Sequence, residues 1–295
     1  MTIRQLEKTF IDQLNAAYDF EEARNLAWLS ISQVCSLTRA QYLGAKEEQL
    51  SLEYETLLLK ILEELKTGKP LQYVLGETEF YGLKFKVNPA VLIPRPETEE
   101  LVDWIIKDVQ KEGGQRLSQI NILDIGTGSG CIPISLKKNL PDIGITSLDI
   151  SAEAIKTAEI NASMNNVQVI FIHDDILNPV QPDVISAKYN LIVSNPPYVT
   201  HDEKMQMHPN VLDFEPHTAL FVENNNPLLF YRAIAIFAKD HLKENGSLYL
   251  EINENFGQET MGLLRQYGFT DIQLRKDLRD SDRMIKAKKP SGIIN

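Results

Sequence analysis

Hydrophobic positions recur at helical spacing through the first 75 residues of this 295-residue chain. The stretch from Glu47 to Thr67 places apolar side chains on one helical face and stops at Gly68 and Pro70, as an amphipathic helix does at its end. No catalytic constellation of side chains occurs here. We therefore predict a small all-α bundle over residues 1–75, whose role is to pack against or recognise something else.

The pattern then changes to short β-prone runs on either side of Gly82, which predicts a β-hairpin linker over residues 76–92. From residue 118 onward, apolar runs alternate with helical stretches, and this alternation indicates α/β architecture with a parallel, doubly wound sheet. The predicted strands are 120–125, 144–149, 167–172, 188–194, 246–252, 269–276 and 283–287. The predicted helices are 97–111, 130–139, 152–164, 227–243 and 256–267.

A glycine-rich turn joins the first strand of this sheet to a helix. Such a turn lets a ligand approach the backbone closely and leaves helix N–H groups free to bind it. A dinucleotide fingerprint would place its third glycine at position 131, where this chain has Cys131, so the spacing favours a different nucleoside cofactor. The candidate cofactor residues in this turn are Asp124, Gly126, Thr127, Gly128, Ser129 and Gly130.

Acidic residues end the next two strands as well. Asp149 could accept hydrogen bonds from both hydroxyls of a ribose, and Asp175 with the Ile176 backbone amide could contact an adenine edge. Asp124 could face a cationic amino-acid group of the cofactor. Each acid alone could equally be a helix cap or a loop residue, but their placement after three successive strands favours one nucleoside site.

A fourth strand stops in a stiff tetrapeptide, because prolines cannot donate to a sheet ladder. Its side-chain amide and first proline carbonyl could together hold a planar –NH2 group, with an aromatic ring packed on it. By itself the tetrapeptide could merely end a strand. Its residues are candidates for catalysis and substrate binding: Asn195, Pro196, Pro197 and Tyr198.

Composition limits which ligands and which cellular compartment the sequence suggests. A net charge of -11 argues against strong nonspecific phosphate binding. Two cysteines, Cys35 and Cys131, suit a reducing compartment, and no histidine–cysteine spacing suggests a metal site, so we expect no metal. Without an apolar leader or a bilayer-length run, the sequence predicts a soluble cytoplasmic protein that does not bind membranes.

Together these motifs resemble the class I S-adenosylmethionine-dependent methyltransferases. Within that class, the segments around Pro70-Leu71-Gln72-Tyr73, Leu92-Ile93-Pro94-Arg95-Pro96-Glu97-Thr98 and Phe214-Glu215-Pro216 look like the HemK/PrmC family of release factor glutamine N5-methyltransferases. This resemblance extends over nearly the whole chain. It implies a Rossmann-like, seven-stranded sheet over residues 93–295 and a helical domain that recognises the release factor.

The resemblance also implies the chemistry. S-adenosylmethionine would methylate the glutamine amide of the Gly-Gly-Gln loop of class I peptide chain release factors and leave S-adenosylhomocysteine. Asn195 would contact both the substrate amide and the cofactor. We expect a monomer that does not bind nucleic acid directly.

Two readings stay open at the level of sequence. A nucleic-acid methyltransferase of the adenine N6 type would explain the tetrapeptide equally well, although the negative charge counts against it. Arg95, held between Pro94 and Pro96, is a candidate substrate contact but could also be a solvated loop charge, and Thr98 is expected to cap the helix that follows.

Overall fold

A computed structural model describes residues 1–113 and 117–290. By its internal contacts the chain divides into two units: Met1–Glu77 with His208–Phe214, and Thr78–Met207 with Glu215 onward. Of the linker predicted over residues 76–92, residues 78–92 are part of the second unit. The segment 208–214, which no sequence pattern distinguishes from its neighbours, is part of the first. Among the described residues, no helix is long and apolar enough to cross a membrane.

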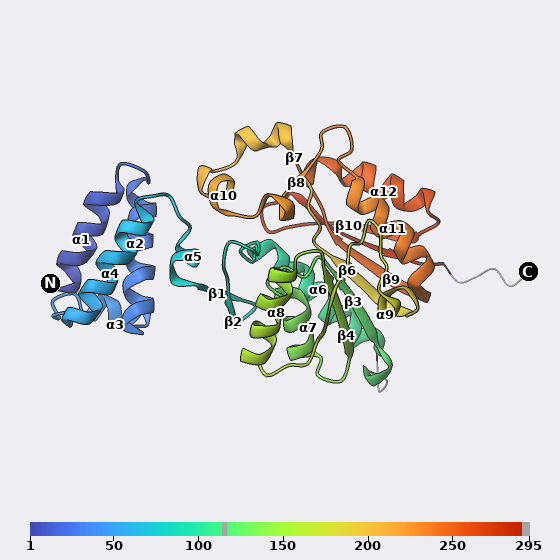
Figure 1. Ribbon diagram of the computed structural model, residues 1–295, viewed down its shortest axis with the longest axis horizontal. Coiled ribbons are helices and arrows are strands. Elements are labelled where there is room, and N and C mark those ends of the chain that lie inside the picture. The colour runs from blue at the N-terminus through green and yellow to red at the C-terminus, as the bar shows by residue number, and fades with distance from the viewer. Residues whose placement is uncertain (114–116, 291–295) are drawn as a thin grey trace, which may run out of the picture. The chain divides into compact units, whose positions relative to one another are not determined.

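The first unit is all helical, as predicted; Figure 1 shows its amino-terminal helices α1–α5 in blue to cyan and α10, from later in the chain, in gold. Thr2 and Gln5 form a capping box on its first helix. The helix predicted over Glu47 to Thr67 starts at Leu52, because Ser51 caps it there. Fully buried leucine and phenylalanine side chains make its core. The helices are α1 (Ile3–Leu14), α2 (Phe20–Cys35), α3 (Arg39–Gly44), α4 (Leu52–Leu65), α5 (Leu71–Leu75) and α10 (Pro209–Phe214).

The second unit starts within the predicted hairpin, which consists of β1 (Glu77–Phe80) and β2 (Leu83–Lys86). Its turn residues Tyr81 and Gly82 both have positive φ, 50° and 71°. That conformation matches the twist of the flanking strands and explains the glycine.

A seven-stranded sheet forms the centre of the second unit, in the order β10-β11-β9-β6-β3-β4-β5. All neighbours pair in parallel except β11, which runs antiparallel to β9 and β10. The predicted seven-stranded α/β sheet is therefore confirmed. Its strands are β3 (Asn121–Ile125), β4 (Gly144–Asp149), β5 (Ile170–His173), β6 (Tyr189–Ser194), β9 (Leu242–Glu251), β10 (Thr270–Lys276) and β11 (Asp282–Lys288).

Helices cover both faces of the sheet (Figure 1). Side chains of α6, α7 and α8 pack in one buried cluster and those of α9, α11 and α12 in another, because alternate strand residues point to opposite faces. The helices are α6 (Pro96–Gly113), α7 (Cys131–Asn139), α8 (Ala152–Met164), α9 (Pro182–Ile185), α11 (Leu229–His241) and α12 (Gly257–Gln266). Shorter elements are η1 (Leu117–Gln119), β7 (Val199–Thr200), η2 (His201–Gln206), η3 (His217–Ala219), β8 (Phe221–Val222) and η4 (Glu254–Phe256).

One local prediction was wrong. Helix α6 begins at Pro96, so Thr98 lies inside its first turn and is not the cap. Its backbone N–H donates to the carbonyl of Arg95, and its hydroxyl donates to Glu251 and accepts from Asn195 rather than accepting from an N–H of the first helical turn. Proline suits this first helical position because its missing N–H is not needed there.

Candidate active site

The site lies where the strand order reverses. Strands β3 and β6 are neighbours, and the chain leaves the carboxyl end of β3 through the glycine loop and that of β6 through the Asn-Pro-Pro-Tyr tetrapeptide. A crevice at such a switch point is where open α/β sheets bind ligands. Both predicted halves of the site are therefore brought to one place in the second unit.

The glycine loop takes a backbone path that needs its glycines. Gly126, Gly128 and Gly130 have φ values of 79°, 53° and 80°. A Cβ on Gly130 would meet Ile134 Cδ1 at 2.8 Å and Ala158 Cβ at 3.1 Å, so the third glycine also lets α7 pack against α8. The predicted loop residues thus form a tight turn at the start of α7, tied to β4 by the Gly126 and Thr127 N–H groups, which both donate to the Leu148 carbonyl.

Asp149 closes the loop from the neighbouring strand β4. One carboxylate oxygen accepts from the Gly128 N–H at 2.8 Å and the other from the Ser151 N–H at 2.8 Å. Burial raises the pKa of Asp149, while these backbone hydrogen bonds oppose the rise. Each carboxylate oxygen has a second lone pair, so the group can still accept the two ribose hydroxyls assigned to it.

Asp124 lies beneath the loop and is fully buried. The Ser147 hydroxyl, which also lies beside the Thr127 hydroxyl, donates to Oδ2, whereas Oδ1 has no hydrogen-bond partner among the described residues. Burial raises the pKa of Asp124 to about 7. Ser129 lines the cavity, and its buried side chain forms a hydrogen bond with the Cys131 thiol. The unpartnered oxygen of Asp124 lies beneath the loop, where a carboxylate charge favours a cationic ligand group in the cavity above it.

The Asp124 carboxyl predicts a pH dependence. Between pH 3.8 and about 7 the folded protein binds more protons than the unfolded chain, so the free energy of unfolding falls as pH rises through this window. Asp124→Asn removes this cost. We expect the stability difference between variant and wild type to move in favour of the variant by about 2–3 kcal/mol from pH 5 to pH 8. Denaturant melts of the ligand-free protein at both pH values measure it, and a constant difference would contradict a raised pKa.

The third strand contributes an organised turn. Asp174, which is buried, accepts backbone hydrogen bonds from Asp175, Val180 and Gln181. This leaves Asp175 and Ile176 on the cavity wall, as predicted for an adenine contact. Asp174 is a supporting residue that the sequence did not distinguish from its neighbour.

The tetrapeptide follows β6 directly. Asn195 Nδ2 donates to Thr98 Oγ1 at 3.2 Å, and the Tyr198 hydroxyl donates to Glu251 Oε1 at 3.0 Å. Burial raises the pKa of Tyr198 well above its usual value, and the nearby Glu251 charge adds to the rise. Tyr198 is therefore a neutral donor.

A cavity of about 390 Å³ joins the two halves. Three predicted residues do not line it: Asp124 lies underneath, Gly130 is enclosed by helices, and Tyr198 points toward Glu251. The predicted contact of the Tyr198 ring with a substrate amide stays a prediction. The predicted residues that do line the cavity are Arg95, Gly126, Thr127, Gly128, Ser129, Asp149, Asp175, Ile176, Asn195, Pro196 and Pro197.

Arg95 has a protein partner that sequence reasoning missed. Its guanidinium lies 2.6 Å from Glu215 Oε1, and the other oxygen of this buried carboxylate accepts from the Ile93 N–H. The pair ties the segment before α6 to the segment after α10, so Arg95 is not a free loop charge. Glu215 belongs to the Phe-Glu-Pro motif, but only the fold shows that its partner lies 120 residues earlier.

This pair predicts a loss of stability. Arg95→Ala leaves a carboxylate buried with one hydrogen bond, and we expect a loss of about 2 kcal/mol, because the arginine is one-third exposed and the pair is only partly desolvated. Urea unfolding of Arg95→Ala and Glu215→Gln measures it. Unchanged stability with a raised KM for the methyl acceptor would instead support Arg95 as a substrate contact.

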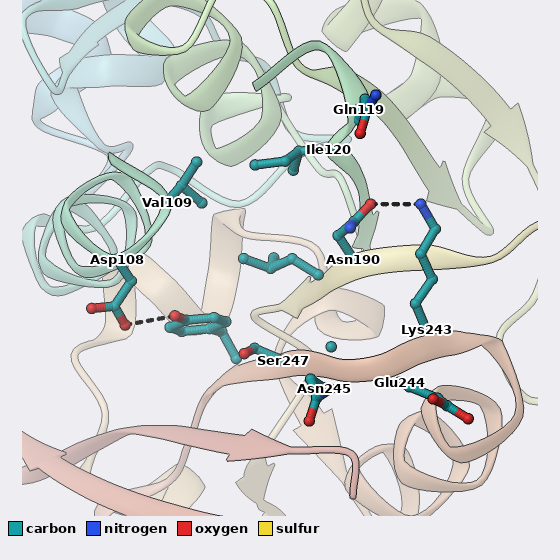
Figure 2. Close-up of a pocket in the computed structure, with 12 residues that line it drawn as sticks. Asp108, Val109, Gln119, Ile120, Asn190, Lys243, Glu244, Asn245 and Ser247 are labelled. Atoms are coloured by element: carbon teal, nitrogen blue, oxygen red, sulfur yellow. Dashed lines mark hydrogen bonds between the residues drawn. The ribbon is translucent and has the colours of Figure 1, made fainter. Parts of the chain in front are cut away.

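A second hollow, of about 310 Å³, lies at the amino ends of β3 and β6 (Figure 2). Lys243 Nζ donates to Asn190 Oδ1 at 2.9 Å, and the Tyr249 hydroxyl donates to Asp108 at 2.7 Å. None of the predicted site residues lines it. Open α/β sheets bind ligands at the carboxyl ends of their strands, so we take the first cavity as the candidate active site.

Comparison with known proteins identifies the family. Residues 5–76 match the PrmC N-terminal domain, and residues 104–213 match the methyltransferase small domain. A release factor glutamine methyltransferase of Flavobacterium psychrophilum is 45% identical over 97% of this chain and 99% of its own length. The chain belongs to the release factor glutamine methyltransferase family. The enzyme of the same name from Bacteroides thetaiotaomicron is 41% identical over 94% of this chain and 96% of its own length.

A solved structure shares the fold. The Thermus thermophilus 16S rRNA N2 G1207 methyltransferase, in complex with AdoMet and guanosine, has a TM-score of 0.50 and 15% identity, and the match covers 72% of this chain and 49% of that one. At this identity the likeness concerns the fold alone. The sequence-based family assignment is confirmed, and it sets aside the adenine N6 alternative.

Proposed function

We propose that this protein transfers a methyl group from S-adenosylmethionine to the side-chain amide nitrogen of the glutamine in the Gly-Gly-Gln loop of class I release factors. The observation that carries the proposal is the position of Asn195 and Pro196 on the wall of the cavity that the glycine loop also lines, in a chain of this family. A single 390 Å³ space can therefore hold methyl donor and acceptor together.

The residues fit the cofactor. S-adenosylmethionine supplies an activated methyl group on a sulfonium. Asp149 offers carboxylate acceptors for the ribose, Asp175 and Ile176 face the same cavity for the adenine, and the loop glycines allow close backbone approach. The cationic amino-acid end is proposed to lie over the glycine loop, where Ser129 lines the cavity and the carboxylate of Asp124 beneath the loop adds a favourable negative charge.

The acceptor residues fit an amide. A glutamine amide nitrogen is a weak nucleophile because its lone pair is delocalised into the carbonyl. Asn195 Oδ1 and the Pro196 carbonyl accept its two N–H groups, aim the nitrogen at the methyl group, and stabilise the positive charge that develops on it. The proton leaves after methyl transfer, so this scheme requires no strong base.

The remaining assignments rest on the family. The helical unit, which matches the PrmC N-terminal domain, is proposed to recognise the release factor. The protein is proposed to act as a monomer and without direct nucleic-acid contact, in keeping with its net charge of -11.

A methyl-transfer assay tests the function. Labelled S-adenosylmethionine is offered with a class I release factor, a variant of that factor with the loop glutamine changed to alanine, DNA, or RNA. We expect label only in the unchanged release factor. Label in DNA or RNA, or equal label in the alanine variant, would contradict the proposal.

A further inference from the structure

A chain of buried hydrogen bonds lies behind the acceptor residue Asn195. Its Nδ2 donates to Thr98 Oγ1 at 3.2 Å, and the Thr98 hydroxyl donates to Glu251 Oε2 at 2.6 Å. Tyr198 donates to the other carboxylate oxygen of Glu251 at 3.0 Å. Thr98, which also lines the cavity, and Glu251 are 2% and 1% exposed, so the side chains themselves shield these bonds from water. The sequence analysis predicted Thr98 only as a helix cap and did not single out Glu251.

The number of protons in this chain determines its direction. A threonine hydroxyl has one proton, and a carboxylate can only accept. The Thr98 proton therefore points to Glu251, and a lone pair of the same oxygen is left facing Asn195. Asn195 must place its –NH2 group there, since its carbonyl oxygen would meet another acceptor.

The other end of the Asn195 amide is consequently fixed as well. Its Oδ1 is turned away from Thr98, and no donor among the described residues bonds it. Asn195 is half-buried and lines the cavity. This is the orientation that a glutamine –NH2 group requires, whereas a flipped amide would set donor against donor.

We propose that Glu251, acting through Thr98, is a positioning residue that holds the Asn195 amide with its oxygen toward the methyl acceptor. This inference rests on the proposed function. Tyr198 occupies the second oxygen of Glu251, so the carboxylate has one fixed hydrogen bond for each oxygen. The tyrosine thereby contributes to positioning from outside the cavity.

Three neighbours favour the ionised, acceptor-only form of Glu251. Thr98 and Tyr198 each donate a hydrogen bond to it and Arg283 adds positive charge, and these contacts oppose the rise in pKa that burial causes. Arg283 is itself held in place, with its Nε 3.0 Å from Asp277 Oδ2 and Nη1 3.4 Å from the Ile252 carbonyl. Glu251 is the last residue of β9, so the sheet fixes its backbone.

The test compares two substitutions of Thr98. Thr98→Val keeps the shape but loses the hydroxyl, and we expect kcat to fall about 10- to 100-fold with little change in the Kd of S-adenosylmethionine. Thr98→Ser restores the hydroxyl and is expected to recover turnover to within about threefold of wild type. If Thr98 had only a structural role, Thr98→Val and Thr98→Ser would not differ in kcat while keeping the same Kd for S-adenosylmethionine.

Thr260→Val is the matched control. Thr260 is fully buried on α12, and its hydroxyl has no partner among the described residues. This variant is expected to turn over like wild type. Glu251→Gln tests the second residue of the hydrogen-bond chain. The new amide would donate to Thr98 or Tyr198, where the carboxylate only accepts, so kcat should fall. If both residues act through the same chain, the double variant with Thr98→Val should be little slower than either single variant.

The outcomes are distinct. Wild-type turnover in Thr98→Val, equal loss in Thr98→Ser and Thr98→Val, or additive losses in the double variant would each overturn the positioning role while leaving the proposed function in place. Failure of the wild-type protein to methylate a release factor would overturn the proposed function, and the positioning role with it.

Discussion

Replacing Asn195 with alanine lowers kcat for release factor methylation about 10²- to 10³-fold, in our expectation, because it removes an acceptor that is most important while charge develops on the glutamine nitrogen. The Pro196 carbonyl remains, so some positioning survives. Affinity for S-adenosylmethionine should stay within about threefold, since the loop and Asp149 are unchanged. Single-turnover kinetics give the rate of methyl transfer, and calorimetry gives the cofactor Kd.

The exposed Asn178 provides a control for this substitution. It lies in the same unit but does not line the cavity, and Asn178→Ala should keep wild-type kcat. An Asn195→Ala variant that kept its kcat would remove Asn195 from the mechanism. A loss confined to cofactor affinity would reassign the residue to cofactor binding alone.

Replacing Asp149 with alanine has the second large effect, on binding of the cofactor. The variant loses the acceptor for the Gly128 and Ser151 N–H groups and the two acceptors proposed for the ribose. Hydrogen bonds to a charged group contribute about 1.5–3 kcal/mol each. We therefore expect the Kd of S-adenosylmethionine to rise at least about 100-fold.

Asp142→Ala is the matched control for the Asp149 variant. Asp142 is an exposed acid near the start of the same strand, outside the cavity, so its loss changes net charge equally without touching the loop. Calorimetry on both variants compares them directly. Equal weakening in the two would mean that long-range charge, not the local contact, governs binding.

The main elements of the fold could be predicted from sequence because each has a local signal. Apolar runs gave the sheet, and Gly82 gave the hairpin turn. Boundaries were less well determined: β9 begins at Leu242, ahead of the predicted 246, and β5 at Ile170, after the predicted 167. Both ends lie where irregular backbone, such as the positive φ of Asn245, interrupts the simple pattern.

The supporting side chains of the site could not be predicted, because their partners are far apart in sequence. Thr98 and Glu251 are separated by 153 positions, and Arg95 and Glu215 by 120. Thr98, between Pro96 and a run of acids, has the local sequence pattern of a helix cap. Its contact with Glu251 exists only because the folded sheet brings the end of β9 next to the start of α6. Asn161 is a further example: its side chain joins the hairpin residue Lys86 to Ser129 of the glycine loop.

The assignment of segment 208–214 to the helical unit also escaped prediction. The sequence divides simply into helical and α/β parts, with the first ending near residue 75. The Tyr18 hydroxyl lies 3.5 Å from Asn210 Nδ2, a contact that periodicity does not reveal. The role of the helical unit in recognising a release factor stays a prediction.

Mass spectrometry of the release factor tests the central claim most directly. A class I release factor is incubated with this protein and S-adenosylmethionine, digested, and the peptide with the Gly-Gly-Gln loop is fragmented. We predict that the glutamine side chain of this loop gains the mass of one CH2 group, and that the gain is lost with Asn195→Ala. An unmodified glutamine, or a methyl group on any other residue, would contradict the account.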